Sequence, residues 1–298
     1  MNVLSAHWFL DTIVAIMHSA TITLFLPLGD AKSLRTAEIS NWSGKAVSAP
    51  RTELEELLAR EELDKAGVYI LIGSDPKTGT PHAYIGEAEV IRDRLKQHKT
   101  KEFWVSAIVF TSKDENLTKA HVRYLESLIL TEASVIGRFS LDQNQSGGSK
   151  LPESDRADME VFFGRIRQLL PVLGSDILTP IAQPPAKPQP GGVLFCRMKG
   201  AEARGQRTAG GFVVFQGSTA VLKERPAAES YPTVLAQRKQ FIADGTLIEK
   251  GGLFVFTKDA EFSSPSAAAA VIHGGSANGL IAWKTEDGIT LKQLDEQA

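Results

Sequence analysis

The sequence predicts an α+β protein with two domains, the first a small α+β sandwich of a hairpin, a third strand and helices. Three observations support this. The chain has 298 residues, which is long enough for two hydrophobic cores. A proline-rich segment at 179–192 interrupts it. Short β-rich runs alternate with helical patterns on both sides of that segment, as in α+β folds.

Composition and charge are ordinary. Hydrophobic residues make up 43% and charged residues 23%, and the formal net charge is -2, so any nucleic-acid contact must come from a local patch. The single cysteine, Cys196, excludes an internal disulfide, and no Cys/His group has zinc-ligand spacing. A cytoplasmic protein is expected. The apolar stretch 13–17 is too short to span a membrane, so no membrane partner is expected.

Residues 1–63 are predicted to be an N-terminal extension. It contains a strand at about 21–26, a loop to about 48 and a helix at about 51–62, whose first half is acidic. Residues 1–16 are expected to be poorly ordered, or to precede a natural start at Met17.

A compact domain is predicted for residues 64–178. Two strands, 67–73 and 82–86, enclose the turn-forming segment 74–80 and make a hairpin. A third strand and three helices complete the domain. They are expected at about 104–110 for the strand and about 88–99, 118–133 and 154–169 for the helices.

The segment 179–192 contains five prolines in eleven residues, which is typical of an extended linker. Residues 193–298 then form a separate small α+β domain. Two strands are predicted at 211–215 and 253–256, with a helix at about 231–243 between them. Ser264-Pro265 is a helix-start signal, Asn278-Gly279 is a turn and Trp283 lies in a strand.

Two features of the first domain suggest chemistry. Tyr69 and Tyr84 occupy the two arms of the hairpin, although paired tyrosines are also ordinary sheet formers. Arg94 and His98 are spaced i,i+4 on the next helix and share a face. A guanidinium there suits a phosphate, because its planar fork binds two oxygens, but a surface arginine beside a capping histidine is an equal alternative.

Acidic and basic residues add to this pattern. Glu126 interrupts a mostly apolar stripe on the helix 118–133, where a buried carboxylate needs a metal or a basic partner such as Arg94. The segment 92–101 is locally basic, which phosphate contacts require and which solvated helix faces also show. Its basic residues are Arg92, Arg94, Lys96, Lys99 and Lys101.

The ordered set Gly67-Val68-Tyr69, Tyr84-Ile85-Gly86, Arg94 and Tyr124-Leu125-Glu126 resembles the GIY-YIG nuclease family. The resemblance covers residues 66–146. Each tripeptide alone is a weak signal, whereas the ordered set at matching spacing is fairly specific. The resemblance implies a GIY-YIG-like fold, which is a small three-stranded antiparallel sheet flanked by helices. It also implies an endonuclease that hydrolyses phosphodiester bonds, with DNA favoured over RNA as substrate.

The same resemblance assigns roles to individual residues. Tyr69, Tyr84, Arg94 and His98 match catalytic positions, and either a tyrosine or the histidine acts as general base. Glu126 matches the ligand of one Mg²⁺ or Mn²⁺ ion. The substrate-binding candidates are Asn144, which is aligned only to within a residue or two, and Arg92 and Lys96 of the basic segment. Glu87 departs from the pattern, because some members have a lysine directly after the second motif.

The C-terminal domain resembles an uncharacterised module that follows such nucleases. Its basic residues could help to read DNA, while a structural or dimerising role is the alternative. They are Arg197, Lys199, Arg204 and Arg207. Two other functions stay open for the whole chain: a nucleic-acid-binding protein whose fold no longer cuts, and a regulator whose C-terminal domain binds a protein partner. The sequence leaves the oligomeric state open.

Overall fold

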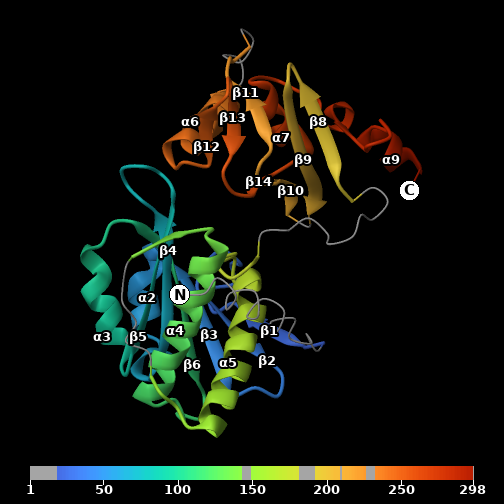
Figure 1. Cartoon of the computed structure of the whole chain (residues 1–298). Coiled ribbons are helices and arrows are strands. Elements are labelled where there is room, and N and C mark those ends of the chain that lie inside the picture. The colour runs from blue at the N-terminus through green and yellow to red at the C-terminus, as the bar shows by residue number, and fades with distance from the viewer. Residues whose placement is uncertain (1–18, 143–148, 181–191, 209, 226–231, 298) are drawn as a thin grey trace. The chain divides into compact units, whose positions relative to one another are not determined.

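The computed structural model describes residues 19–142, 149–180, 192–208, 210–225 and 232–297, and divides into two compact units (Figure 1). The first unit is Met1–Thr179 and the second is Pro180–Ala298. Three sequence predictions concern residues outside the described ranges: the start of the chain at residues 1–16, Asn144, and most of the proline-rich linker at 179–192.

A seven-stranded sheet forms the centre of the first unit, in the order β1-β2-β3-β6-β4-β5-β7. All neighbours are antiparallel except β5 and β7. The strands are β1 (Ile22–Phe25), β2 (Arg35–Ile39), β3 (Gly44–Pro50), β4 (Gly67–Ser74), β5 (Pro81–Ala88), β6 (Trp104–Ser112) and β7 (Ser140–Leu141). The predicted strands are present as β4, β5 and β6, but the expectation of a sheet with only three strands is wrong.

The strands β1, β2 and β3 account for this difference between the predicted and the observed sheet. β3 pairs along its whole length with β6, so the segment expected as an N-terminal extension continues the central sheet. The expected loop up to residue 48 contains β2 and most of β3. Most buried positions of β3 carry small side chains, among them Ala46, Ser48 and Ala49. Such small residues give a weak alternating pattern in the sequence, and pairing with β6 decides the conformation.

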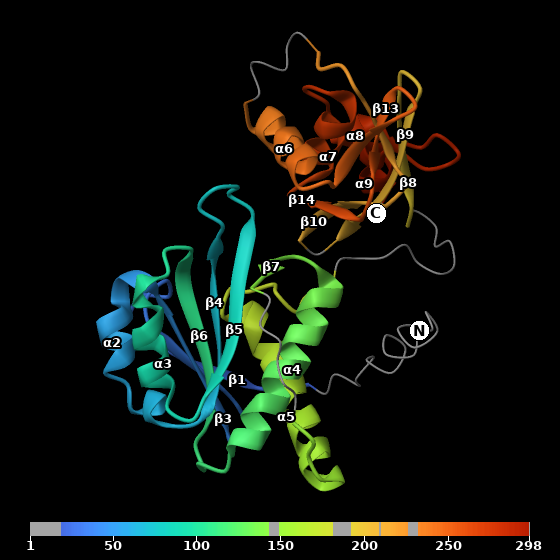
Figure 2. The ribbon, with the colours of Figure 1, turned by 60° about the vertical axis from the view of Figure 1, so that its left-hand side comes forward.

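Helices cover both faces of this sheet (Figure 2). One face carries α4 (Lys119–Ile136) and α5 (Glu153–Val172), and the other carries α2 (Leu54–Leu58) and α3 (Ile91–Gln97). Three short 3-10 helices lie next to α2 and α3 along the chain: η1 (Arg51–Glu53), η2 (Glu61–Asp64) and η3 (His98–Thr100). We call the two sides the α4/α5 face and the α2/α3 face.

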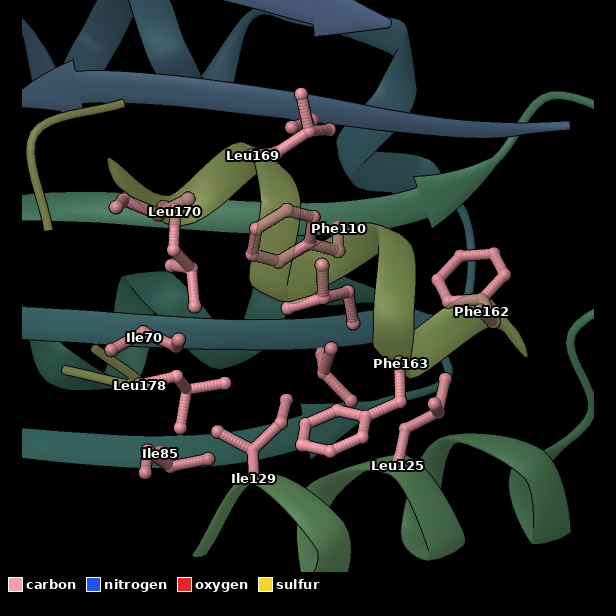
Figure 3. Close-up of a cluster of buried hydrophobic side chains, with 14 of the residues drawn as sticks. Ile70, Ile85, Phe110, Leu125, Ile129, Phe162, Phe163, Leu169, Leu170 and Leu178 are labelled. Carbon is pink, nitrogen blue, oxygen red and sulfur yellow. The ribbon is translucent and has the colours of Figure 1, made fainter. Parts of the chain in front are cut away.

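The α4/α5 face holds the larger apolar core. Leu125 and Ile129 of α4 lie against Ile85 of the sheet, and Phe163 of α5 joins them (Figure 3). Because neighbouring residues of a strand point to opposite faces, Val68 and Ile70 enter this core, whereas Tyr69 and Leu71 enter the other. This alternation determines which side of the sheet carries the tyrosines.

The second unit contains two sheets and a core of its own. The larger has the order β14-β10-β9-β8-β15 and the smaller β11-β13-β12. The strands are β8 (Leu194–Met198), β9 (Ala201–Thr208), β10 (Gly211–Val214), β11 (Thr219–Val221), β12 (Leu247–Lys250), β13 (Leu253–Phe256), β14 (Ala260–Phe262) and β15 (Trp283–Lys284). The helices are α6 (Pro232–Ala243), α7 (Pro265–His273), α8 (Gly279–Ala282) and α9 (Leu291–Gln297).

Candidate functional site

A polar cluster lies within the core of the α2/α3 face. The hydroxyl of Tyr69 on β4 is 2.8 Å from Nε2 of His98, which follows α3. Tyr69 is fully buried and His98 is 5% exposed. The indole of Trp104 donates a hydrogen bond to the carbonyl oxygen of His98, so the backbone of the histidine is fixed as well. The helix α3 and the central sheet thus hold this pair rigidly.

Tyr84 and Arg94 extend the cluster outward. The ring of Tyr84 lies 4.7 Å from that of His98 and 6.0 Å from that of Tyr69, measured between centroids. Arg94 is exposed on α3, and its guanidinium interacts with the hydroxyls of both tyrosines and with Oε1 of Gln97. The four predicted catalytic residues therefore meet at one place, with buried members inside and a cation at the surface.

Three residues beside this cluster have no role in the prediction from sequence. The ammonium of Lys101 lies 4.0 Å from the ring centroid of Tyr84 and 3.3 Å from a carboxylate oxygen of Asp142. Asp142 also accepts from Nε2 of His82 at 3.0 Å. Pairing of β7 with β5 brings Asp142 here, a contact between residues about sixty positions apart that no local pattern reveals. In the sequence, Lys101 is only the last basic residue of the segment 92–101 and has no role of its own.

The glycines of the two tripeptide motifs, Gly67 and Gly86, are required because a larger residue would clash at either position. A β-carbon at Gly86 would lie 2.5 Å from the hydroxyl oxygen of Tyr69, so only glycine leaves room for that side chain. A β-carbon at Gly67 would lie 2.2 Å from the carbonyl oxygen of Phe110 on β6. Both motif glycines are thus needed where β4 and β5 pack against their surroundings.

Glu87 does not point toward the cluster. Strand alternation directs Tyr84 and Gly86 to one face and Ile85 and Glu87 to the other. On that α4/α5 face, Glu87 pairs with Arg123 of α4 at 3.6 Å. The departure from the family pattern therefore places no acid among the tyrosines.

Glu126 lies on α4, three residues after Arg123, and its side chain is half-buried at the margin of the stripe formed by Val122, Leu125 and Ile129. The helix packs on the face opposite the tyrosines. β7 pairs only with His82 and Ala83, so within the described residues no strand covers β5 from Tyr84 onward. The helix α4 thus contacts β5 on the face opposite the tyrosines.

The remaining candidates are placed differently. Arg92 turns away from the tyrosines to η2, where it pairs with Asp64 at 2.7 Å and donates to the carbonyl oxygen of Arg60. Lys96 is exposed and lies 3.5 Å from Asp93 on its own helix. Asn144 lies two residues after Asp142, outside the described residues.

Electrostatics distinguish the members of the cluster. Burial, followed by the neighbouring cations Lys101 and Arg94, lowers the pKa of His98 to about 4, so its imidazole is neutral at pH 7. Burial and the proximity of Tyr84 raise the pKa of Tyr69 well above its usual range, although Arg94 opposes this. The interaction with Tyr69 is the main cause of a raised pKa at Arg94. The resting cluster therefore combines two phenols, a neutral imidazole and a permanent cation.

The side chains of this cluster can bind an anion and accept a proton. Arg94 offers several donors to an anion at the surface. His98 is available as a proton acceptor, and the phenol of Tyr69 is hydrogen-bonded to it. In the described ranges, no three His, Cys, Asp or Glu side chains form a ready metal site. A magnesium ion is often held by one or two carboxylates, with waters and phosphate completing its shell, so half-buried Glu126 satisfies the minimum requirement.

In the second unit, the helix-start and turn signals identified in the sequence have structural roles. Ser264 caps α7, and Ser266 accepts a hydrogen bond from the backbone of Gly279. The indole of Trp283 donates to the carbonyl oxygen of Pro265. A β-carbon at Gly279 would lie 2.3 Å from the backbone of Pro265, so glycine is required there. These residues hold α7, α8 and β15 together.

Among the helices that the structure describes, none is long and apolar enough to span a bilayer. Comparison with curated proteins and with solved structures gives no match. The resemblance of residues 66–146 to the GIY-YIG nucleases is not among the findings of these comparisons and stays a prediction. Residues 194–295, which comprise nearly the whole second unit, match the model of the family described as "Domain of unknown function (DUF4357)".

Proposed function

We propose that the first unit is an endonuclease that hydrolyses phosphodiester bonds in nucleic acid, preferably DNA, with the help of Mg²⁺ or Mn²⁺. One observation carries this proposal. Tyr69, Tyr84, Arg94 and His98, which belong to three separate segments of the chain, meet in one cluster that is polar inside and cationic at the surface. A sheet does not need such a cluster for its stability, because apolar residues would fill the same space.

Burial suggests how the roles divide. Tyr69 is fully buried and bonded to His98, so this pair positions its neighbours and provides a route for a proton. Tyr84, at 6% exposed, is buried like His98, whereas Arg94 is exposed, so Arg94 is the member that a phosphate at the surface meets. Arg94 stabilises negative charge on the phosphate oxygens as they become more charged in the transition state.

The general base is a neutral group in this proposal. A tyrosinate at position 69 is disfavoured, because its pKa is raised. His98 is neutral and its Nε2 lies 2.8 Å from the hydroxyl of Tyr69, but its pKa of about 4 makes it a weak base at pH 7. The proposed route takes the proton of the attacking water through the phenols to His98, and a negative phosphate bound at Arg94 would favour the protonated imidazole.

Glu126 is the proposed metal ligand. A bound divalent ion would polarise the scissile phosphate and stabilise the leaving oxygen. The helix α4 that carries Glu126 packs against β5, the strand that carries Tyr84, on the face opposite the tyrosine.

Cleavage assays with wild type and Glu126→Ala test the proposal. Plasmid DNA, single-stranded DNA and RNA are each incubated with Mg²⁺ or Mn²⁺, and Glu89→Ala, an exposed carboxylate paired with Lys119, is the control. We expect metal-dependent cleavage of DNA by wild type and by the control, and none by Glu126→Ala. Absence of cleavage by wild type on every substrate would contradict the enzyme proposal. Equal rates for wild type and Glu126→Ala would contradict the ligand assignment only.

A further inference from the structure

The solvent-facing side of the larger sheet in the second unit carries a row of three residues on adjacent strands. Lys284 of β15 is the direct partner of Phe195 of β8, and Phe195 is the direct partner of Arg204 of β9. Side chains at directly opposed positions point to the same face. Their strand neighbours Trp283, Cys196 and Ala203 are buried in the core, so the row faces away from it.

An aromatic ring between cations is unusual on an exposed sheet face. Phe195 is half-buried, whereas Arg204 and Lys284 are exposed. A third cation lies over the ring, because the guanidinium carbon of Arg197 is 5.0 Å from its centroid, and a stacking base would take its place. Among the described residues, neither Arg204 nor Lys284 makes an ion pair within this unit.

Two carboxylates lie near these cations, because Glu202 interacts electrostatically with Arg197 and Arg204, and Glu286 interacts with Arg197. Arg197 donates to Glu202 at 2.8 Å, but both side chains are more than half exposed, at 56% and 53%. An exposed pair of this kind contributes little, so a phosphate can replace the carboxylate. The row Lys284, Phe195, Arg204 together with Arg197 therefore gathers three cations around one half-buried ring.

We infer that this row is a binding site for single-stranded nucleic acid, in which a base stacks on Phe195 and the cations bind the flanking phosphates. Stacking on an aromatic ring within a basic surface is the general mode by which proteins hold single strands. A duplex offers the same phosphates, but its bases are already stacked on each other. An acidic peptide offers charge without flat rings, so it would use the cations but not the phenyl face.

Binding by this row goes beyond the proposed cleavage and does not depend on it. The test therefore uses the full chain with Glu126→Ala in EDTA, where cleavage cannot interfere. Fluorescence anisotropy is measured with a labelled oligothymidylate of about 20 nucleotides, which exceeds the site size of a typical single-strand-binding fold. A duplex of the same length and a polyglutamate peptide are the comparison probes.

Phe195→Leu keeps the buried apolar contact but removes the aromatic face. We expect it to weaken single-strand binding about tenfold and to leave duplex binding within about twofold. Arg204→Ala/Lys284→Ala is expected to lower the salt dependence of single-strand binding by about 1.4 in the slope of log K against log salt, for two phosphate contacts. The control Lys250→Ala/Lys258→Ala removes two other exposed lysines of this unit and should leave both quantities unchanged.

Three results would overturn the inference. Unchanged single-strand affinity in Phe195→Leu would exclude stacking. A salt slope equally reduced by the control would show that general charge, rather than this row, holds the strand. Displacement of the oligothymidylate by polyglutamate at similar concentration would identify an acidic-peptide surface instead.

Discussion

Each unit of this protein buries polar side chains in its core, but the two units use them differently. In the second unit, Arg238 is 1% exposed and donates to the backbone carbonyl oxygens of Val271, Val221 and Leu222. Its guanidinium thus ties three segments together. In the first unit, Tyr69 and His98 bond to one another, and their neighbours Tyr84 and Arg94 lead to the surface.

The second unit also contains a cysteine, Cys196, which is a potential nucleophile. Sγ of Cys196 lies 3.2 Å from Nε2 of His273, and both residues are buried. Burial raises the pKa of the thiol to about 12 and lowers the pKa of the imidazole. The pair is a neutral hydrogen bond, not a reactive thiolate. The Cys196–His273 pair is thus a structural element of the core, whereas the cluster of the first unit continues to the exposed Arg94.

The largest expected effect tests the structural half of this comparison. Arg238→Met leaves three buried carbonyl oxygens without their donor, so we expect the free energy of unfolding to fall by about 3–5 kcal/mol. Urea denaturation monitored by circular dichroism measures this. The neighbouring Lys239→Met, an exposed position on the same helix, should change stability by less than about 0.5 kcal/mol. A similar value for both variants would mean that Arg238 is not a structural tie.

The substitution Arg94→Ala tests whether the polar cluster of the first unit is functional. We expect cleavage to fall by about 10²–10³, which corresponds to about 3–4 kcal/mol of transition-state stabilisation, because Arg94 would neutralise charge on the phosphate. The free energy of unfolding should change little, since the side chain is exposed. Arg94→Lys, which keeps the charge but not the planar fork, should recover only part of the rate. A large loss of stability with normal specific activity would reverse the assignment.

The two buried histidines predict a pH dependence of stability. The folded protein keeps His98 neutral down to a pKa of about 4, whereas the unfolded chain binds a proton near 6.5. The stability is therefore complete above pH 6.5 and falls toward pH 4, by up to about 3 kcal/mol from His98. His98→Gln should flatten this slope for the first unit, and His273→Gln should do so for the second. An unchanged slope in His98→Gln would exclude the histidine as its origin.

Tyr69→Phe is the smallest of these changes. It removes one hydroxyl and leaves Nε2 of His98 without its partner, so we expect a loss of about 1–2 kcal/mol in stability. A double-mutant cycle with His98→Leu measures the coupling, expected at about 0.5–1.5 kcal/mol. Additive effects of the two substitutions would show that the hydrogen bond contributes nothing.

Much of the local structure was accessible from the sequence. The hairpin strands, the third strand and the helices around them lie close to their predicted ranges, because each has a strong hydrophobic pattern or clear turn and capping signals. Strands β2 and β3 were missed, since small and polar residues occupy much of their length. They are strands because β6 offers a pairing edge, and that edge is a property of the folded sheet.

The candidate site, like the fold, could be predicted only in part from the sequence. The sequence by itself determined the residue types and spacing that nominate Tyr69, Tyr84, Arg94 and His98, because the hairpin and the following helix lie close together in the chain. Only the tertiary structure directed Glu87 away from them, packed the helix that carries Glu126 on the opposite face of the sheet, and brought Asp142 beside Lys101. Strand alternation and the pairing of β7 with β5 decided these positions, since both depend on which faces and edges meet when the sheet forms.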